Sequence, residues 1–201
     1  MPEPLDFYFD FGSPYGYLAS LRVDAIAAKH GRTVAWRPIL LGAVFKTEGT
    51  QPLSMYPLKG PYFEHDCFRT ARRLGVPFML PDNFPPNTIT AQRAYYWLRD
   101  MVADNAKSFA SGIYHAYFGE GRDVTQAEVV AEIAESEAGV EPVEVTAAVQ
   151  DQAVKDLLRE ATEQAIAKGV FGSPFIIVDG ESFWGNDRLD EVDAWLETGG
   201  W

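Results

Sequence analysis

The sequence predicts an α/β protein with strands near both ends of the chain and helices between them. Three observations support this class: a strand–helix–strand pattern within the first ~40 residues, a hairpin pattern near residue 180, and helical periodicity in the long middle segment. The simplest packing joins the strands of both ends in one sheet. We therefore expect residues 1–45 plus 165–201 to form one domain, into which residues 46–164 insert as an all-helical domain.

The first unit is predicted to run as strand, helix and strand. Residues 5–10 are rich in aromatic side chains, which favours a strand. Ser13 suits an N-cap, Pro14 suits the first helical position, and Gly31 suits the end of the helix. Residues 33–39 are predicted to form the second strand. A strand, a helix and a strand within about 35 residues have the length of a right-handed crossover unit.

The middle of the chain is predicted to be helical. From residue 41 to residue 139 the apolar side chains recur with a helical period, and no strong strand pattern interrupts them. A proline-rich connector at residues 76–87 separates two of the helical segments. The segments expected as helices include residues 62–74, 90–103, 108–118 and 146–168.

The C-terminal part of the chain predicts a hairpin followed by a last helix. Asp179 and Gly180 between two apolar runs are a strong signal for a two-residue turn. Residues 175–178 and 182–184 are therefore expected to be the strands of this hairpin.

Composition and charge exclude several classes of protein. Hydrophobic residues make up 47% of the chain and aromatic residues 13%, which supports a packed core and argues against disorder. The 29 acidic residues outnumber the 17 basic ones, and the net charge of −12 disfavours nucleic acids and anionic membranes as partners. The sequence has no apolar run of ~20 residues and no secretory leader pattern, so we expect a cytoplasmic location.

The sequence lacks the motifs of several classes of enzyme. Cys67 is the single cysteine, so an intrachain disulfide is excluded, and we expect it to be a small buried side chain. The three histidines show no metal-ligand spacing, so no metal site is expected. The sequence contains neither a phosphate-binding loop nor a dinucleotide-binding fingerprint.

Ser13 is the first candidate for chemistry, because it stands at the start of a predicted helix. Free backbone N–H groups and the helix dipole favour negative charge there. A hydroxyl at this place cannot exchange disulfides, but it can hydrogen-bond a thiolate that another molecule delivers. The same environment lowers the pKa of that thiol. The alternative is an ordinary N-cap serine.

The second candidate is the run Gly172-Ser173-Pro174 before an apolar strand. An X–Pro bond in this setting is compatible with a cis peptide. A cis turn exposes the backbone N–H and C=O of Ser173 for pairing with an extended peptide. The alternative is a trans proline that begins a strand.

Five segments distributed over the whole chain resemble a known family. They are residues 9–15, 37–46, 84–87, 169–174 and 183–189. In these segments the chain resembles the 2-hydroxychromene-2-carboxylate isomerases, which are relatives of the kappa-class glutathione transferases and of the DsbA-type oxidoreductases. The resemblance implies a thioredoxin-like domain with an inserted helical domain, in which the turns at Ser13 and Ser173 are neighbours in space.

The resemblance implies glutathione as the cofactor. Ser13 would hold the glutathione sulfur as a thiolate, and the backbone of Ser173, before a cis Pro174, would pair with the cysteinyl part. The γ-glutamyl end would contact a further set of residues: Trp184, Gly185, Asn186, Asp187 and Arg188. Relatives usually carry valine where this chain has Ser173, so its polar side chain is expected to alter the pocket.

The resemblance also implies an aromatic carboxylate as the small-molecule substrate, and a homodimer. Lys46 and Asn87 match family positions associated with this substrate, and a cation suits its carboxylate. Tyr56, Pro57 and Lys59 lie on a loop that would cover the pocket, and Lys59 is, like Lys46 and Arg188, a candidate cation for an anionic ligand. Without the resemblance, Lys46 is an ordinary surface lysine.

Three functions are compatible with these residues. The main prediction is glutathione-dependent isomerisation of 2-hydroxychromene-2-carboxylate to trans-o-hydroxybenzylidenepyruvate in aromatic hydrocarbon catabolism, by reversible addition of a thiolate. The second function is a kappa-like glutathione transferase that joins the thiolate to an electrophile. The third is a non-catalytic module that binds peptides in the groove beside Pro174.

Overall fold

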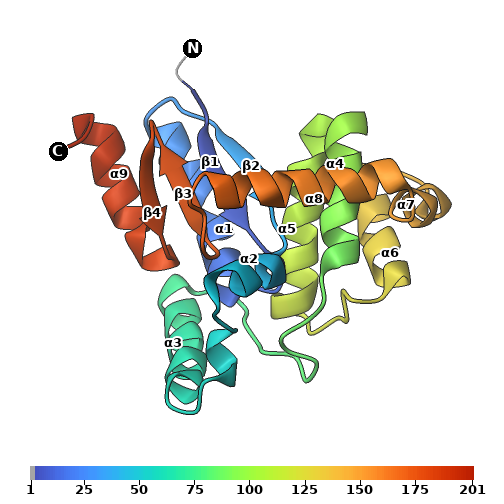
Figure 1. The fold of residues 1–201 in the computed structure, drawn as a ribbon, viewed down its shortest axis with the longest axis horizontal. Helices are drawn as coiled ribbons and strands as arrows, with labels where there is room; N and C mark the ends of the chain where they lie inside the picture. The colour runs from blue at the N-terminus through green and yellow to red at the C-terminus, as the bar shows by residue number, and fades with distance from the viewer. Residues whose placement is uncertain (1–2) are drawn as a thin grey trace.

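The structure is a computed structural model that describes residues 3–201. Strands lie at both ends of the chain and helices in the middle (Figure 1). In chain order the elements are β1 (Leu5–Phe9), α1 (Pro14–Lys29), β2 (Val34–Pro38), α2 (Leu41–Glu48), η1 (Leu53–Met55), α3 (Lys59–Leu74), α4 (Ile89–Met101), α5 (Ala103–Tyr114), η2 (His115–Gly119), α6 (Ala127–Ala138), α7 (Pro142–Ala148), α8 (Gln152–Ala167), β3 (Phe175–Val178), β4 (Glu181–Trp184), η3 (Asn186–Arg188) and α9 (Leu189–Thr198).

The four strands form one sheet in the order β2-β1-β3-β4, which joins the two ends of the chain. β1 pairs parallel with β2 and antiparallel with β3, and β4 completes the hairpin with β3. Because β1 and β3 are antiparallel, with Tyr8 opposite Phe175, the residues after β1 lie beside the residues before β3. The predicted α/β class, with helices between two strand-containing ends of the chain, is confirmed.

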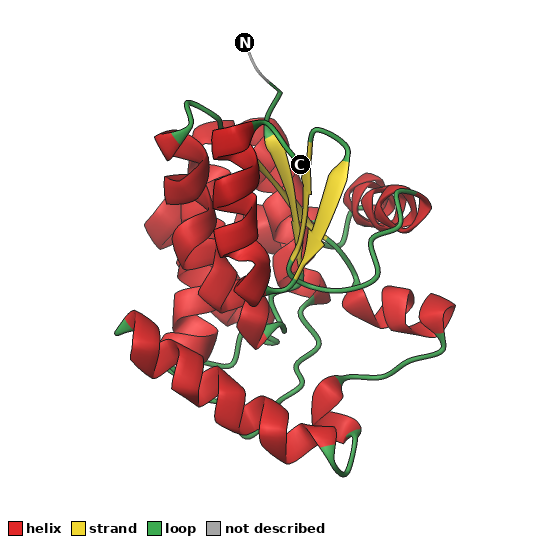
Figure 2. Cartoon of the chain, turned by 90° about the vertical axis from the view of Figure 1, so that its left-hand side faces the viewer, coloured by secondary structure: helices red, strands yellow, loops and turns green. Residues whose placement is uncertain are grey.

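Helices cover both faces of the sheet (Figure 2). On the face crossed by α8, Tyr8, Ala165 and Phe175 belong to one buried cluster. On the other face, Phe7 and Ile176 belong to the larger core, which also contains the buried side of α1. Adjacent residues of one strand thus join different clusters, as the alternation of side chains along a strand requires.

The helices of the middle segment pack against one another and continue the core of the sheet. Phe9 of β1 contacts Tyr95 of α4 and Tyr114 of α5, at ring-centroid distances of 6.2 and 5.7 Å. α8 contacts both α4 and β2, and so links the helices to the sheet. The domain boundaries expected from the sequence stay a prediction.

One helix expected from the sequence is divided in the structure. The segment 146–168 was expected to be continuous, but α7 ends at Ala148 and α8 begins after Asp151. The Asp151 carboxylate accepts a hydrogen bond from the Ala153 N–H at 2.9 Å. This N-cap starts a new helix although the apolar period continues across it.

η1 and α3 form an arm that extends from the rest of the molecule (Figure 1). The arm buries Phe63, Cys67 and Ala71 on one side of α3. Phe63 packs edge-on against Tyr15 of α1 at 5.6 Å and stacks on Phe84 at 6.0 Å. These contacts hold the arm over the end of the sheet where β1 ends and β3 begins.

Candidate active site

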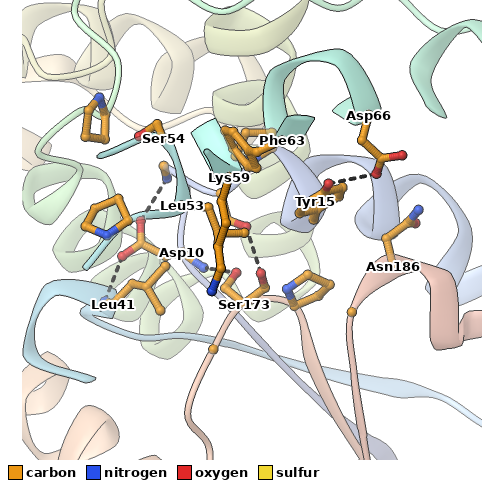
Figure 3. Close-up of a pocket in the computed structure, with 18 of the residues that line it drawn as sticks. Asp10, Tyr15, Leu41, Leu53, Ser54, Lys59, Phe63, Asp66, Ser173 and Asn186 are labelled. Carbon is orange, nitrogen blue, oxygen red and sulfur yellow. Dashed lines mark hydrogen bonds between the residues drawn. The ribbon is translucent and has the colours of Figure 1, made fainter. Parts of the chain in front are cut away.

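A cavity of about 1010 Å³ lies under the arm of η1 and α3, at the end of the sheet where β1 ends and β3 begins (Figure 3). Its walls come from the start of α1, from α2, from η1 and α3, and from the segments before β3 and after β4. These segments are distant in sequence. The strand order β2-β1-β3-β4 brings them together, because it places the two ends of the chain side by side.

The two turns that were expected to be neighbours meet at the base of this cavity. The Ser173–Pro174 peptide bond is cis. Ser13, which is 6% exposed, donates its hydroxyl hydrogen to the Ser173 carbonyl oxygen at 2.9 Å. The Ser13 oxygen also accepts the Gly16 N–H at 3.0 Å. Ser13 is therefore both the N-cap of α1 and the link to the proline turn.

Asp10 is a buried carboxylate beside these turns, and it was not among the residues predicted from the sequence. Its Oδ1 accepts the Gly12 N–H at 2.8 Å and the Thr88 hydroxyl at 2.9 Å, and its Oδ2 accepts the Leu41 N–H at 2.9 Å. Burial raises the pKa of Asp10, although these hydrogen bonds oppose the rise. One side chain thus holds the starts of α1, α2 and α4 around the cavity. The signal that could have revealed it is a carboxylate at the end of an aromatic strand.

The end of β4 and the segment after it line the cavity with all of their predicted residues: Trp184, Gly185, Asn186, Asp187 and Arg188. Asn186 is 3% exposed, and its Oδ1 has no hydrogen-bond partner among residues 3–201. A buried polar atom without a partner costs free energy, and a ligand that donates a hydrogen bond removes this cost. Asn186 therefore marks a polar binding position in the cavity.

Lys59, at the start of α3, points across the cavity toward the Ser173 turn (Figure 3). Its ammonium lies 5.0 Å from the centroid of the Tyr56 ring, and the described part of the chain provides it with no ion pair. The protein as a whole carries a net charge of −12. An uncompensated cation makes this cavity a favourable place for an anionic ligand.

Three of the four residues expected to contact the organic substrate lie outside the cavity lining: Lys46, Pro57 and Asn87. α2 presents Phe45 to the cavity, and Lys46 is exposed because adjacent residues of a helix point in different directions. Asn87 accepts the Ile89 N–H at 3.2 Å and so supports the start of α4. Only Tyr56 of this set lines the cavity, and Lys59 of the same predicted loop lines it as well.

Cys67 and Tyr15 lie close to the cavity but supply no anion at neutral pH. Burial raises the pKa of the Cys67 thiol from 9.0 to about 12. Tyr15 donates its hydroxyl hydrogen to Asp66 at 2.7 Å. Burial, together with this carboxylate, raises the pKa of Tyr15 well above its usual value. Neither side chain therefore supplies a phenolate or thiolate to this cavity at neutral pH.

The family model described as the DsbA-like thioredoxin domain matches residues 4–197. The chain belongs to the DsbA-like thioredoxin family. A 2-hydroxychromene-2-carboxylate isomerase of Sphingobium xenophagum is 31% identical to this DsbA-like protein, over 98% of this chain and 99% of its own. Glutathione S-transferase kappa 2 of Caenorhabditis elegans is 29% identical, over 94% of this chain and 90% of its own.

A solved structure of a 2-hydroxychromene-2-carboxylate isomerase superposes on the DsbA-like protein with a TM-score of 0.88 and 28% identity, covering 96% of this chain and 94% of that chain. The resemblance noted in the sequence is confirmed, and the protein is an enzyme of this isomerase family. Within residues 3–201, no helix is long and apolar enough to cross a membrane. Among the side chains that the structure describes, in residues 3–102 and 105–201, no group of three or more potential metal ligands of the His, Cys, Asp or Glu type is found.

Proposed function

We propose that the protein binds glutathione in the cavity and uses its thiol to isomerise 2-hydroxychromene-2-carboxylate to trans-o-hydroxybenzylidenepyruvate. The observation that carries this proposal is the contact between Ser13 and the cis-proline turn of Ser173 at the base of the cavity. The volume of about 1010 Å³ suits a tripeptide together with an aromatic carboxylate. The isomerase relatives support the choice of substrate.

The residues of the cavity fit the parts of glutathione. The backbone of Ser173 suits the cysteinyl unit, since extended peptides pair with exposed backbone groups. The unpaired Oδ1 of Asn186 and the carboxylate of Asp187 suit the γ-glutamyl ammonium. Lys59 suits a carboxylate of glutathione or of the substrate, because its positive charge attracts an anion although the protein as a whole is negatively charged.

Glutathione would supply a thiolate whose reversible addition turns the conjugated double bond into a single bond, so that rotation and elimination leave the trans isomer. The Ser13 hydroxyl stabilises the negative sulfur, and the start of α1 contributes the positive end of the helix dipole. Tyr15 and Phe63 form an aromatic wall that excludes water. Lys59 orients a carboxylate by its charge.

Replacing Ser13 by alanine tests this role. A hydrogen bond to a charged group contributes about 1.5–3 kcal/mol, so we expect Ser13→Ala to lower kcat about 10- to 100-fold. The Kd for glutathione, measured by calorimetry, should change much less, since the peptide contacts remain. Equal activity of Ser13→Ala and the wild type at neutral pH would count against the proposed role.

Product analysis tests the reaction. With the chromene substrate, an isomerase forms the trans product and returns all glutathione as free thiol. Calorimetry with glutathione and with trialanine tests recognition of the cofactor. Equal affinity for the two tripeptides, without turnover, would point to a peptide-binding module.

A glutathione transferase is the second candidate, and the kappa-class relative of Caenorhabditis elegans favours it. Ser13 would then activate the thiol for a lasting bond to an electrophile. One glutathione would be consumed for each product formed, which thiol titration separates from isomerisation. A homodimer and a cytoplasmic location stay predictions.

Gly172 provides a test of the cavity wall that does not alter Ser13. A Cβ added at Gly172 would overlap Nε1 of Trp184, so Gly172→Ala is expected to displace the indole from the cavity. We expect a change in tryptophan fluorescence and about tenfold weaker glutathione binding. Gly42→Ala is the matched control, because Gly42 lines the same cavity and its Cβ would meet nothing within 4 Å. Unaltered binding in Gly172→Ala would contradict this placement of Trp184.

A further inference from the structure

The hydroxyl of Ser13 has one hydrogen, and that hydrogen is already engaged. Ser13 donates to the Ser173 carbonyl at 2.9 Å, while the Gly16 N–H occupies a lone pair of the same oxygen at 3.0 Å. Ser13 can stabilise a sulfur anion only if its hydrogen leaves the Ser173 carbonyl. That departure removes the hydrogen-bond partner of the Ser173 carbonyl oxygen, which lies beside the nearly fully buried Ser13 side chain.

We propose that the cysteinyl N–H of glutathione takes over the Ser173 carbonyl and thereby releases the Ser13 hydroxyl to the sulfur. This inference rests on the function proposed above. The exchange is favourable because every group keeps a partner, and because a hydrogen bond to an anion is stronger than one to a neutral carbonyl. Recognition of the ligand backbone and activation of its thiol are thus coupled.

A second hydrogen bond keeps the Ser173 turn in place during the exchange. The Ser173 side-chain oxygen accepts the Asp10 N–H at 3.0 Å, and the Ser13 N–H donates to the Asp10 carbonyl at 2.9 Å. The buried Tyr114 donates to the same Asp10 carbonyl at 3.0 Å. The two turns therefore stay connected when the Ser13 hydroxyl rotates, and the Ser173 carbonyl keeps its position for the ligand.

The coupling selects the kind of thiol that the site activates. A simple thiol such as 2-mercaptoethanol brings a sulfur but no amide N–H. When Ser13 turns to that sulfur, the Ser173 carbonyl is left unpaired, and this cost offsets the gain. The site therefore lowers the thiol pKa of cysteinyl peptides more than that of simple thiols.

The test compares glutathione with an ester analogue in which oxygen replaces the cysteinyl N–H. The analogue keeps the shape of the ligand and loses this one donor. The thiol pKa of each ligand, bound at saturation, is measured from the ultraviolet absorbance of the thiolate over a pH series. For the wild type we expect the pKa of the bound analogue to lie about one unit or more above that of bound glutathione.

Two variants complete the comparison. In Ser13→Ala, both bound ligands should show the same high pKa, because the hydrogen that would be released is absent. Thr70→Ala removes another hydroxyl of the cavity lining and should preserve the wild-type difference. Equal pKa values for the two ligands in the wild type would overturn the coupling, even with full isomerase activity. Absence of glutathione binding would instead refute the proposed function.

A structural comparison decides the matter if the analogue does not bind. In a crystal structure with glutathione, the Ser13 oxygen should lie within hydrogen-bond distance of the sulfur and outside that distance from the Ser173 carbonyl. The cysteinyl N–H should then donate to Ser173. A hydrogen bond between Ser13 and Ser173 that persists in the complex would overturn the proposal.

Discussion

Replacing Gly16 by alanine is expected to lower the free energy of unfolding by about 2–3 kcal/mol. A Cβ at Gly16 would overlap the hydroxyl of the fully buried Tyr114 and lie 3.1 Å from both Ser13 Cβ and Ser173 Oγ. All three neighbours belong to the junction of the two turns, so little room exists for relaxation. This loss of stability is opposite in sign to the effect of helix propensity alone, since alanine is favoured over glycine in a helix by about 1 kcal/mol.

Chemical denaturation measures this effect, with Gly42→Ala as the control in another helix. The Cβ at Gly42 would meet nothing within 4 Å, so that variant should be as stable as the wild type or slightly more stable. Tyr114→Phe removes the overlapping oxygen, and combining it with Gly16→Ala should cost less than the sum of the two single changes. A Gly16→Ala protein of wild-type stability would show that the junction is loosely packed.

Asp10→Asn is expected to have the second large effect, a loss of about 2–4 kcal/mol in the free energy of unfolding. The carboxylate accepts hydrogen bonds from Gly12, Leu41 and Thr88. Asparagine offers one acceptor oxygen, and its amide N–H groups would face donors. At least one buried donor is left unpaired, so the starts of α1, α2 and α4 should loosen together.

The pH dependence of this loss has a definite sign. Burial raises the pKa of Asp10, so the folded protein holds its proton more tightly than the unfolded chain does. The stabilising contribution is complete below the ordinary value of 3.8 and is lost as the pH rises through the raised pKa. The stability gap between the wild type and Asp10→Asn should therefore narrow as the pH rises from 3.8 to the raised pKa, and it should stay constant above the raised pKa. A gap that widens over this range would contradict the assignment.

Asp6 provides a control for which the pH dependence of the stability gap has the opposite sign. Burial alone would raise its pKa, but Arg37 and Lys168 together lower it. The gap between the wild type and Asp6→Asn should therefore grow as the pH rises from the lowered pKa to 3.8 and stay constant above it. Denaturation curves at a series of pH values for both variants separate the two carboxylates.

Local signals in the sequence predicted the class of fold, and the family resemblance predicted that the turns at Ser13 and Ser173 meet. Ser13 before Pro14 marks a helix start, and Asp179-Gly180 marks a hairpin turn, whatever surrounds them. The prediction was less successful where two local signals compete. The apolar period of residues 146–168 favoured one helix, and the cap at Asp151 divides it.

Other features of the site depend on contacts between distant parts of the chain, so no local pattern contains them. Ser13 and Ser173 are 160 positions apart, and their hydrogen bond exists because β1 and β3 pair antiparallel in the sheet. Asp10 becomes a common anchor because three helices begin around it. Lys59 lines the cavity and Lys46 does not, because α2 turns Lys46 outward while the start of α3 directs Lys59 toward the Ser173 turn.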